Sequence, residues 1–328
     1  MVFPDPPEQA RFVFERTLRF NENVEQPSTA DRWRRFATGA PKEVRGLVKP
    51  FDVAAFQGRV YVTDSIQRWV VMFDIPGGRF VEFGKEEPGQ LSKPTGIAVT
   101  PTGEVLVADT GTQRVMIYDA NGRYLRAIGS REQLQRPADV AMDWQRGRVY
   151  VVDTGGIESQ QHRLVVYDWN SGRHLQSIGT RGEAEGQFNL PLQVAVDADG
   201  HVYVTDSGNF RVQAFNPDGS FRLAFGSLGR YPGQFARPKG IATDPLGNVY
   251  VVDTAFGNFQ IFDSQGRLLL FIGKRGEAGR PATYQLPAGI GIDVDGRVYV
   301  VDQFFRKIDV FRPASLERLQ GFTAPPPE

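Results

Sequence analysis

The hydrophobic residues of this chain fall in short runs, and one run recurs six times with the pattern Val-x-Val-x-Asp. Each copy is apolar at almost every position before its closing aspartate, which predicts a β-strand buried on both faces. Successive closing aspartates are 44 to 53 residues apart, and a period of this length predicts one supersecondary unit per copy. The copies are Val60–Asp64, Val105–Asp109, Val149–Asp153, Val202–Asp206, Val249–Asp253 and Val298–Asp302.

The unit between residues 94 and 128 shows what one repeat contains. Four apolar runs are separated by turn residues, and the last turn carries the Asn121-Gly122 pair that favours a tight β-hairpin. Four short antiparallel strands per repeat predict the blade of a propeller. The strands expected in this blade are Pro94–Val99, Val105–Asp109, Val115–Tyr118 and Tyr124–Ile128.

Six repeats predict an all-β, six-bladed β-propeller with four antiparallel strands per blade. The last repeat has only three expected strands before Pro313, and residues 11–16 otherwise have no partner. We therefore expect the N-terminal strand to pair into the last blade and close the ring, which leaves no open sheet edge. We expect a Pro-rich segment at 1–10, a single propeller at 11–313 and a tail at 314–328. Within the propeller region we expect the closing strand at 11–16 and a short helix and linker at 28–38. The blades are expected to start near residues 48, 92, 135, 189, 236 and 285.

Composition and charge exclude several classes of protein. Lys plus Arg and Asp plus Glu both number 38, so the net charge is zero, and general binding of nucleic acid through an excess of positive charge is not expected. The chain has no cysteine, which excludes disulfides, iron–sulfur clusters and CxxCH haem attachment. Its three histidines fall at different radii of the expected ring and do not predict a zinc site. No apolar stretch is long enough to span a membrane, and the first residues lack the pattern of a signal peptide.

The blades resemble NHL repeats. The resemblance is carried by Pro94–Val99, Gly103–Gly111 and the Arg114-Val115 pair, and by the linkers Gly186-Gln187-Phe188 and Gly233-Gln234-Phe235. It covers about residues 48 to 313. The resemblance implies a ring that binds other macromolecules, although a minority of related six-bladed rings are enzymes with a metal at the axis.

The opening residues 3–11 are similar to the start of mature bacterial propeller proteins that are exported or lipid-anchored. This resemblance implies a periplasmic, cell-surface or extracellular location, with a lipid anchor in the native precursor as one option. Bacterial proteins that this chain resembles often accompany exported redox proteins. The resemblance therefore implies a protein partner, and a multihaem cytochrome is one such partner.

The repeated aspartates predict structural contacts rather than a catalytic ring. In three blades a basic residue follows the aspartate five positions later, and in the third blade it follows ten positions later. An aspartate that accepts backbone N–H groups and pairs with such a cation would brace the turn. The residues of this structural repeat are Asp64, Asp109, Asp153, Asp206, Asp253 and Asp302, with Arg114, Arg163, Arg211 and Lys307.

Departures from the repeat give candidates for a partner surface. The turn at 154–162 is five residues longer than its equivalents, and loops on one face of a propeller carry recognition, although a harmless insertion is the alternative. The turns also carry aromatic residues and arginines, which are enriched in protein interfaces but also occur singly on any surface. The candidate partner-binding residues are Arg68, Trp69, Gln113, Ile157, Glu158, His162, Phe210, Phe256, Phe304, Phe305 and Arg306.

The third position of the inner strands gives a second group of candidates. Glycine stands there in three blades, whereas Asp52, Asp139 and Gln193 stand there in the others. Because inner strands begin at the mouth of the central channel, these side chains and the neighbouring Lys239 predict a site for a small polar ligand or cation. Oxygen ligands suit Ca²⁺. Two carboxylates are few for a tight calcium site, and pairing with nearby basic residues is the alternative.

We therefore expect a non-enzymatic scaffold whose loop face docks a protein partner and which needs no cofactor. The chain contains no nucleophile elbow, phosphate-binding loop or HExxH sequence. The alternative function is a hydrolase or lactonase-like site at the channel mouth, with a divalent metal such as Ca²⁺ held by Asp52 and Asp139.

Overall fold

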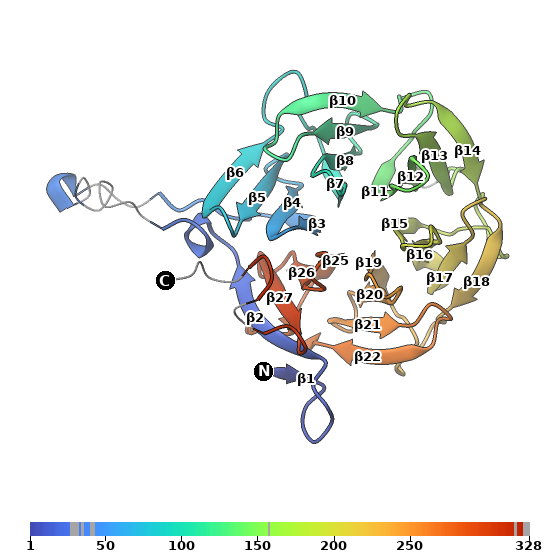
Figure 1. Cartoon of the computed structure of the whole chain (residues 1–328). Helices are drawn as coiled ribbons and strands as arrows, with labels where there is room; N and C mark the ends of the chain where they lie inside the picture. Colours follow the sequence, from blue (N-terminus) through green and yellow to red (C-terminus); the bar gives the residue numbers. More distant parts are fainter. Residues whose placement is uncertain (27–32, 34–35, 40–42, 157, 318–319, 324–328) are drawn as a thin grey trace.

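Six antiparallel sheets surround a central axis in the computed structural model of the chain (Figure 1). The structure describes residues 1–26, 33, 36–39, 43–156, 158–317 and 320–323. The innermost strands of the six sheets line the axis, and each sheet extends outward from it (Figure 1). The predicted six-bladed β-propeller is confirmed.

Blades 1 to 3 each have four strands in sequence order from the axis outward. Blade 1 consists of β3 (Pro50–Phe56), β4 (Arg59–Asp64), β5 (Trp69–Asp74) and β6 (Arg79–Phe83). Blade 2 consists of β7 (Pro94–Val99), β8 (Val105–Asp109), β9 (Arg114–Tyr118) and β10 (Tyr124–Ile128). Blade 3 consists of β11 (Pro137–Asp143), β12 (Arg148–Asp153), β13 (Arg163–Asp168) and β14 (His174–Ile178).

Blades 4 and 5 repeat this order, and blade 6 draws its outer strands from the N-terminal segment. Blade 4 consists of β15 (Pro191–Val196), β16 (Val202–Asp206), β17 (Arg211–Phe215) and β18 (Phe221–Phe225). Blade 5 consists of β19 (Pro238–Thr243), β20 (Val249–Asp253), β21 (Asn258–Phe262) and β22 (Leu268–Ile272). Blade 6 consists of β25 (Pro287–Ile292), β26 (Val298–Asp302), β27 (Lys307–Pro313), β2 (Phe12–Leu18) and β1 (Val2–Phe3).

The remaining elements are short. They are the 3-10 turns η1 (Asn21–Asn23) and η2 (Ser207–Asn209), and the parallel pair β23 (Lys274–Arg275) and β24 (Thr283–Tyr284). Most of the helix predicted at 28–38 lies outside the described residues. In the part of the chain that the structure describes, no helix is both long and apolar enough to cross a membrane.

The hydrophobic core lies between neighbouring blades. Every residue of the second strand β8 is buried, as expected for a strand covered by a sheet on each side. One cluster joins Leu106 and Val115 of blade 2 to Val149, Val165 and Tyr167 of blade 3. Each blade therefore buries its apolar residues against the next blade in the ring.

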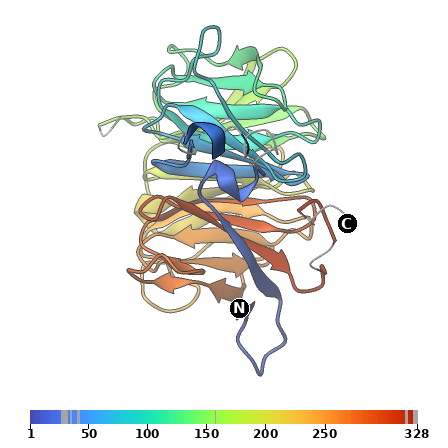
Figure 2. The same ribbon diagram turned by 90° about the vertical axis from the view of Figure 1, so that its left-hand side faces the viewer.

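The ring closes through the N-terminal strand. β2 runs antiparallel to β27, with Phe14 opposite Phe311 and Leu18 opposite Ile308, and lies along the outer side of the last blade (Figure 2). The predicted pairing is confirmed, although the strand spans Phe12–Leu18 instead of 11–16.

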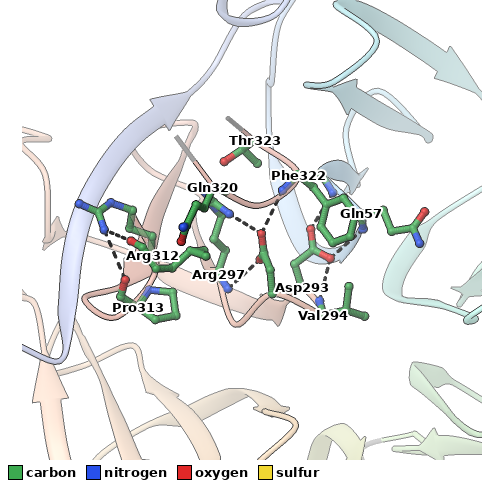
Figure 3. Close-up of polar contacts among 12 residues, drawn as sticks. Gln57, Asp293, Val294, Arg297, Arg312, Pro313, Gln320, Phe322 and Thr323 are labelled. Carbon is green, nitrogen blue, oxygen red and sulfur yellow. Dashed lines mark hydrogen bonds and ion pairs between the residues drawn. The ribbon is translucent and has the colours of Figure 1, made fainter. Parts of the chain in front are cut away.

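A buried arginine holds both ends of the chain to blade 6. Figure 3 shows this residue, Arg297, together with Gln320 of the C-terminal segment. The side chain of Arg297 is fully buried, and its Nε donates to Glu15 Oε2 at 2.7 Å. It also pairs with Asp295 and donates to the Gln320 carbonyl at 3.1 Å. Thr323 donates to the other Glu15 oxygen at 2.9 Å. The N-terminal strand, the hairpin of blade 6 and the C-terminal segment therefore share one polar cluster.

Replacing Glu15 with Ala should destabilise the ring by about 3 kcal/mol, because it leaves a fully buried guanidinium with one fewer charged partner. Chemical denaturation monitored by circular dichroism measures this loss. The matched control is Glu8→Ala, which removes an exposed carboxylate from the same end of the chain and should leave the midpoint unchanged. Equal midpoints for the two variants would contradict a role of Glu15 in closure.

Candidate functional site

One face of the ring carries the turns between the second and third strands and the linkers between blades; we call this the loop face. Its turns follow the repeated aspartates, at residues 65–68, 110–113, 154–162, 207–210, 254–257 and 303–306. The candidate partner-binding residues lie in these turns or directly after them.

All six repeated aspartates are buried and organise the loop face. Asp109 shows the pattern: it accepts the N–H groups of Ser92 at 2.6 Å and Lys93 at 2.8 Å, which precede the inner strand, and that of Gly111 at 2.8 Å in its own turn. The other five also accept N–H groups from the linker that precedes their inner strand. Each carboxylate thereby fixes the linker of its blade.

The basic residues that follow these aspartates behave differently from blade to blade. Arg163 pairs with Asp153 at 3.1 Å, and Arg211 pairs with Asp206 at 2.8 Å. Lys307 is buried and pairs instead with Asp309 at 2.6 Å. Arg114 is exposed. The predicted pair of aspartate and basic residue therefore forms in blades 3 and 4. It does not form in blade 6, where the lysine pairs with another aspartate, and in blade 2 the arginine is exposed.

The residue after the repeated aspartate forms a contact between blades that the sequence analysis missed. Thr110 donates to the Pro137 carbonyl at 2.9 Å, Thr154 to Pro191 at 2.7 Å, and Ser207 to Pro238 at 2.7 Å. Each hydroxyl thus holds the first residue of the next blade's inner strand. The signal was present in the repeat, since serine or threonine follows the aspartate in five of the six copies.

The long turn of blade 3 contains both exposed and buried candidates. Glu158 is exposed, and Ile157 lies outside the described residues. His162 is buried, and its Nδ1 accepts the Leu190 N–H at 3.1 Å; burial lowers the pKa of His162. This histidine therefore holds a linker from within the protein rather than lying on the surface.

The other rim candidates divide by exposure. Phe304 is 57% exposed, and Arg68 and Arg306 are also exposed. Trp69 is half-buried beneath Lys85, whose Nζ lies 4.1 Å from the ring centroid. The half-buried remainder comprises Gln113, Phe210, Phe256 and Phe305.

The channel-mouth candidates Asp52, Asp139 and Gln193 are all buried at the axis and join neighbouring blades. Their side chains accept N–H groups of the next inner strand: Asp52 from Ile97 at 3.2 Å, Asp139 from Val194 at 2.8 Å, and Gln193 from Ile241 at 3.2 Å. The neighbouring glycines leave room for them. A Cβ on Gly96 would lie 1.9 Å from Asp139 Oδ1, and one on Gly289 would lie 2.2 Å from Asp52 Oδ1.

The axial groups have shifted pKa values. Burial raises the pKa of Asp52 to about 6, and the nearby Gln193 amide and Lys239 charge limit the rise. Burial and the charge of Asp52 raise the pKa of Asp139. Burial lowers the pKa of Lys239 to about 8. Two interacting carboxyls with raised pKa values favour one shared negative charge over two.

Metal binding at the axis rests on few ligands. In the part of the chain described, no group of three or more His, Cys, Asp or Glu side chains is placed to hold a metal ion. Oδ1 of Asp139 and Nε2 of Gln193 are buried without a hydrogen-bond partner among the described residues. Because the Gln193 oxygen accepts the Ile241 N–H, its amide nitrogen is the atom left unpaired, and a donor does not ligate a cation. The arrangement suits an acid pair that joins neighbouring blades better than a calcium site.

Comparison with known proteins identifies the repeat. Residues 91–118, 188–215 and 235–262 match the model of the NHL repeat. The chain is 30% identical over 146 residues to the protein brain tumor of Drosophila melanogaster, covering 43% of this chain and 13% of that protein. It is 30% identical over 220 residues to the E3 ubiquitin-protein ligase TRIM71 of Gallus gallus, covering 66% of this chain and 20% of that protein. The chain thus spans a fifth or less of these relatives' length.

Solved structures share the fold at low sequence identity. A gluconolactonase from Xanthomonas campestris superposes with a TM-score of 0.62 at 17% identity, covering 81% of this chain and 86% of that chain. A streptogramin B lyase superposes with a TM-score of 0.58 at 15% identity, covering 81% and 94%.

The six sheets define a β-propeller, and the aspartate that recurs in each blade shows that the propeller is built from tandem repeats. Since three of its blades match the NHL model, the chain contains NHL repeats.

The acid pair predicts how stability depends on pH. The unfolded carboxyl of Asp139 titrates near 3.8, and its folded pKa is raised. A rising pH therefore ionises the unfolded chain first, and stability falls as the pH rises from about 4 through the folded pKa values. Asp139→Asn, which stays neutral, should flatten this fall and unfold at higher denaturant concentration than the wild type at about pH 8.

Denaturation midpoints at about pH 5 and about pH 8 test this expectation. Asp199→Asn, which removes an exposed carboxylate, is the control and should keep the wild-type pH dependence. Parallel pH profiles for wild type and Asp139→Asn would refute the acid pair.

Proposed function

We propose that this protein is a non-enzymatic scaffold that docks a protein partner on its loop face. The observation that carries the proposal is the set of exposed arginines and Phe304 in turns whose backbones are held by buried aspartates. Arginine and aromatic residues supply most of the binding energy in protein interfaces. Rigid turns also lower the entropic cost of binding. NHL propellers generally bind protein partners, which agrees with this function.

We further propose a location in the bacterial cell envelope or the extracellular space. The similarity of residues 3–11 to exported propeller proteins supports this location. Under this proposal the partner is an exported redox protein, and a multihaem cytochrome is the class to test first. Immunodetection in fractionated source cells tests the location, and recovery in the cytoplasmic fraction would refute it.

A second candidate function is a lactonase-like site at the axis. The buried acid pair of Asp52 and Asp139 favours it, because carboxyls with raised pKa values are typical of acid–base sites. Gluconolactonase and lyase structures with the same fold also favour it. The closed axial packing of both carboxyls favours the scaffold.

Removing exposed side chains of the loop face should weaken partner binding without unfolding the ring. The variant Arg68→Ala/Phe304→Ala/Arg306→Ala should bind the partner at least about tenfold more weakly, since interface arginines and aromatics each contribute more than about 1 kcal/mol. The partner is first captured from source-cell extract and identified by mass spectrometry. Its Kd is then measured with purified proteins.

Leu246→Ala provides the matched control, because Leu246 is 87% exposed in a turn of the opposite face. It should bind like the wild type, and both variants should keep the wild-type Tm. Unchanged binding by the triple variant, or an equal loss in the control, would move the binding surface away from the loop face.

Calcium separates the two candidate functions. If Asp52 and Asp139 form a packed acid pair at the axis, they bind no calcium. About 1 mM Ca²⁺ should then shift the Tm of the wild type and of Asp52→Ala by the same small amount. Differential scanning fluorimetry measures both shifts. A calcium-dependent rise confined to the wild type would support the metal-dependent enzyme instead.

A further inference from the structure

The residue immediately before the inner-strand proline is basic in four of the six blades. In blades 4 and 6 this residue is leucine. All four basic side chains are exposed. They are Lys49, Lys93, Arg136 and Arg237.

The fold brings these residues to the mouth of the central axis on the loop face. Each precedes the first residue of a strand that lines the axis (Figure 1). Their backbones are fixed, because the repeated aspartate of the same blade accepts each N–H: at 2.9 Å for Lys49, 2.8 Å for Lys93, 2.7 Å for Arg136 and 3.0 Å for Arg237. We call these four residues the axial cations.

The axial cations lie outside the ion pairs that the described residues form. Within the described residues, none of the four side chains forms a salt bridge or a side-chain hydrogen bond. Arginines in the turns of the opposite face differ, because Arg123 and Arg267 each pair with an aspartate of their own turn. In the part of the chain that the structure describes, no acidic side chain therefore forms an ion pair with these four exposed charges.

Lys239 adds a fifth positive charge beneath them. Its Nζ lies 4.1 Å from the centroid of Phe51, and it is half-buried. The pKa of Lys239 is lowered to about 8, mainly by burial; Asp52 opposes this change, and the charges of Lys49 and Arg237 contribute to it. Because the charges of Lys49 and Arg237 repel that of Lys239, an anion bound among these side chains would relieve the repulsion.

The charge around the axial cations limits the size of that anion. Exposed glutamates lie in the linkers between the outer strand of one blade and the inner strand of the next. They are Glu86, Glu87, Glu132, Glu183, Glu185 and Glu277. A long polyanion crossing the loop face would pass these carboxylates, whereas a short acidic segment would meet mainly the axial cations. The zero net charge of the chain likewise disfavours a nucleic acid.

We propose that the axial mouth of the loop face binds a short acidic segment of the protein partner, whose carboxylates pair with Lys49, Lys93, Arg136 and Arg237. This inference rests on the proposed scaffold function and names the chemistry of its partner. Complementary charge at such a site speeds association and fixes orientation.

The test uses the full chain and a fluorescein-labelled oligo-glutamate peptide. The variant Lys93→Gln/Arg136→Gln/Arg237→Gln should bind this peptide about tenfold more weakly than the wild type, as three exposed ion pairs imply. The matched control is Arg123→Gln/Arg173→Gln/Arg267→Gln, which removes the same charge from exposed positions of the opposite face and should bind within about twofold of the wild type. Fluorescence anisotropy at about 0.05 M and about 0.2 M salt gives both affinities, and binding should weaken at the higher salt.

Three results would overturn the inference: no binding of the peptide by the wild type at low salt, an equal loss in both triple variants, or tighter binding of oligouridine of the same length. Circular dichroism confirms that the variants are folded, and Lys93→Gln alone should give a smaller loss in the same direction. The proposed function fails separately. If Arg68→Ala/Phe304→Ala/Arg306→Ala loses the partner while the axial variant retains it, the scaffold stands and this inference is wrong.

Discussion

The buried repeated aspartate is the interaction on which the rest of the structure depends. Its carboxylate ends a fully buried strand and accepts N–H groups from the linker before the inner strand, as Asp109 does from Ser92 and Lys93. An unpaired carboxylate or amide at that depth would be costly, so each blade forms with its linker in one geometry. The following hydroxyl, as in Thr154, then holds the next blade. One short sequence thereby sets both the blade and its place in the ring.

Two further polar clusters complete the ring at different radii. At the outside, Arg297 and Glu15 hold the terminal segments in a buried ion pair. At the axis, Asp52 and Asp139 cross to the neighbouring inner strands. Buried charged groups tolerate little displacement, because each would lose partners that water cannot replace. The two clusters therefore add specificity to a core that is otherwise built from similar apolar residues.

The same carboxylates connect the fold to the proposed function. By fixing the linkers and turns of the loop face, they hold the exposed arginines of the rim and the axial cations in a rigid arrangement. Negative charge lies buried below this face and positive charge lies exposed at its centre. A chain with zero net charge can therefore present a strongly basic site. Enzymes with the same fold are no obstacle to a scaffold, since function belongs to the site and not to the fold.

Six blades and the closure of the ring could be predicted from the repeat period, the strand pattern and the unpaired N-terminal run. These features depend on short-range sequence patterns that are present in each repeat. Equivalent positions in the repeat singled out Asp52, Asp139 and Gln193, but not the N–H groups of the next inner strand that these side chains accept. Contacts between segments distant along the chain did not follow. Arg297 finds Glu15 across the whole sequence, Lys307 pairs with Asp309 instead of the repeated aspartate, and His162 turns inward to Leu190. Residue type alone allows several partners for each of these side chains, and burial in the assembled ring selects one of them.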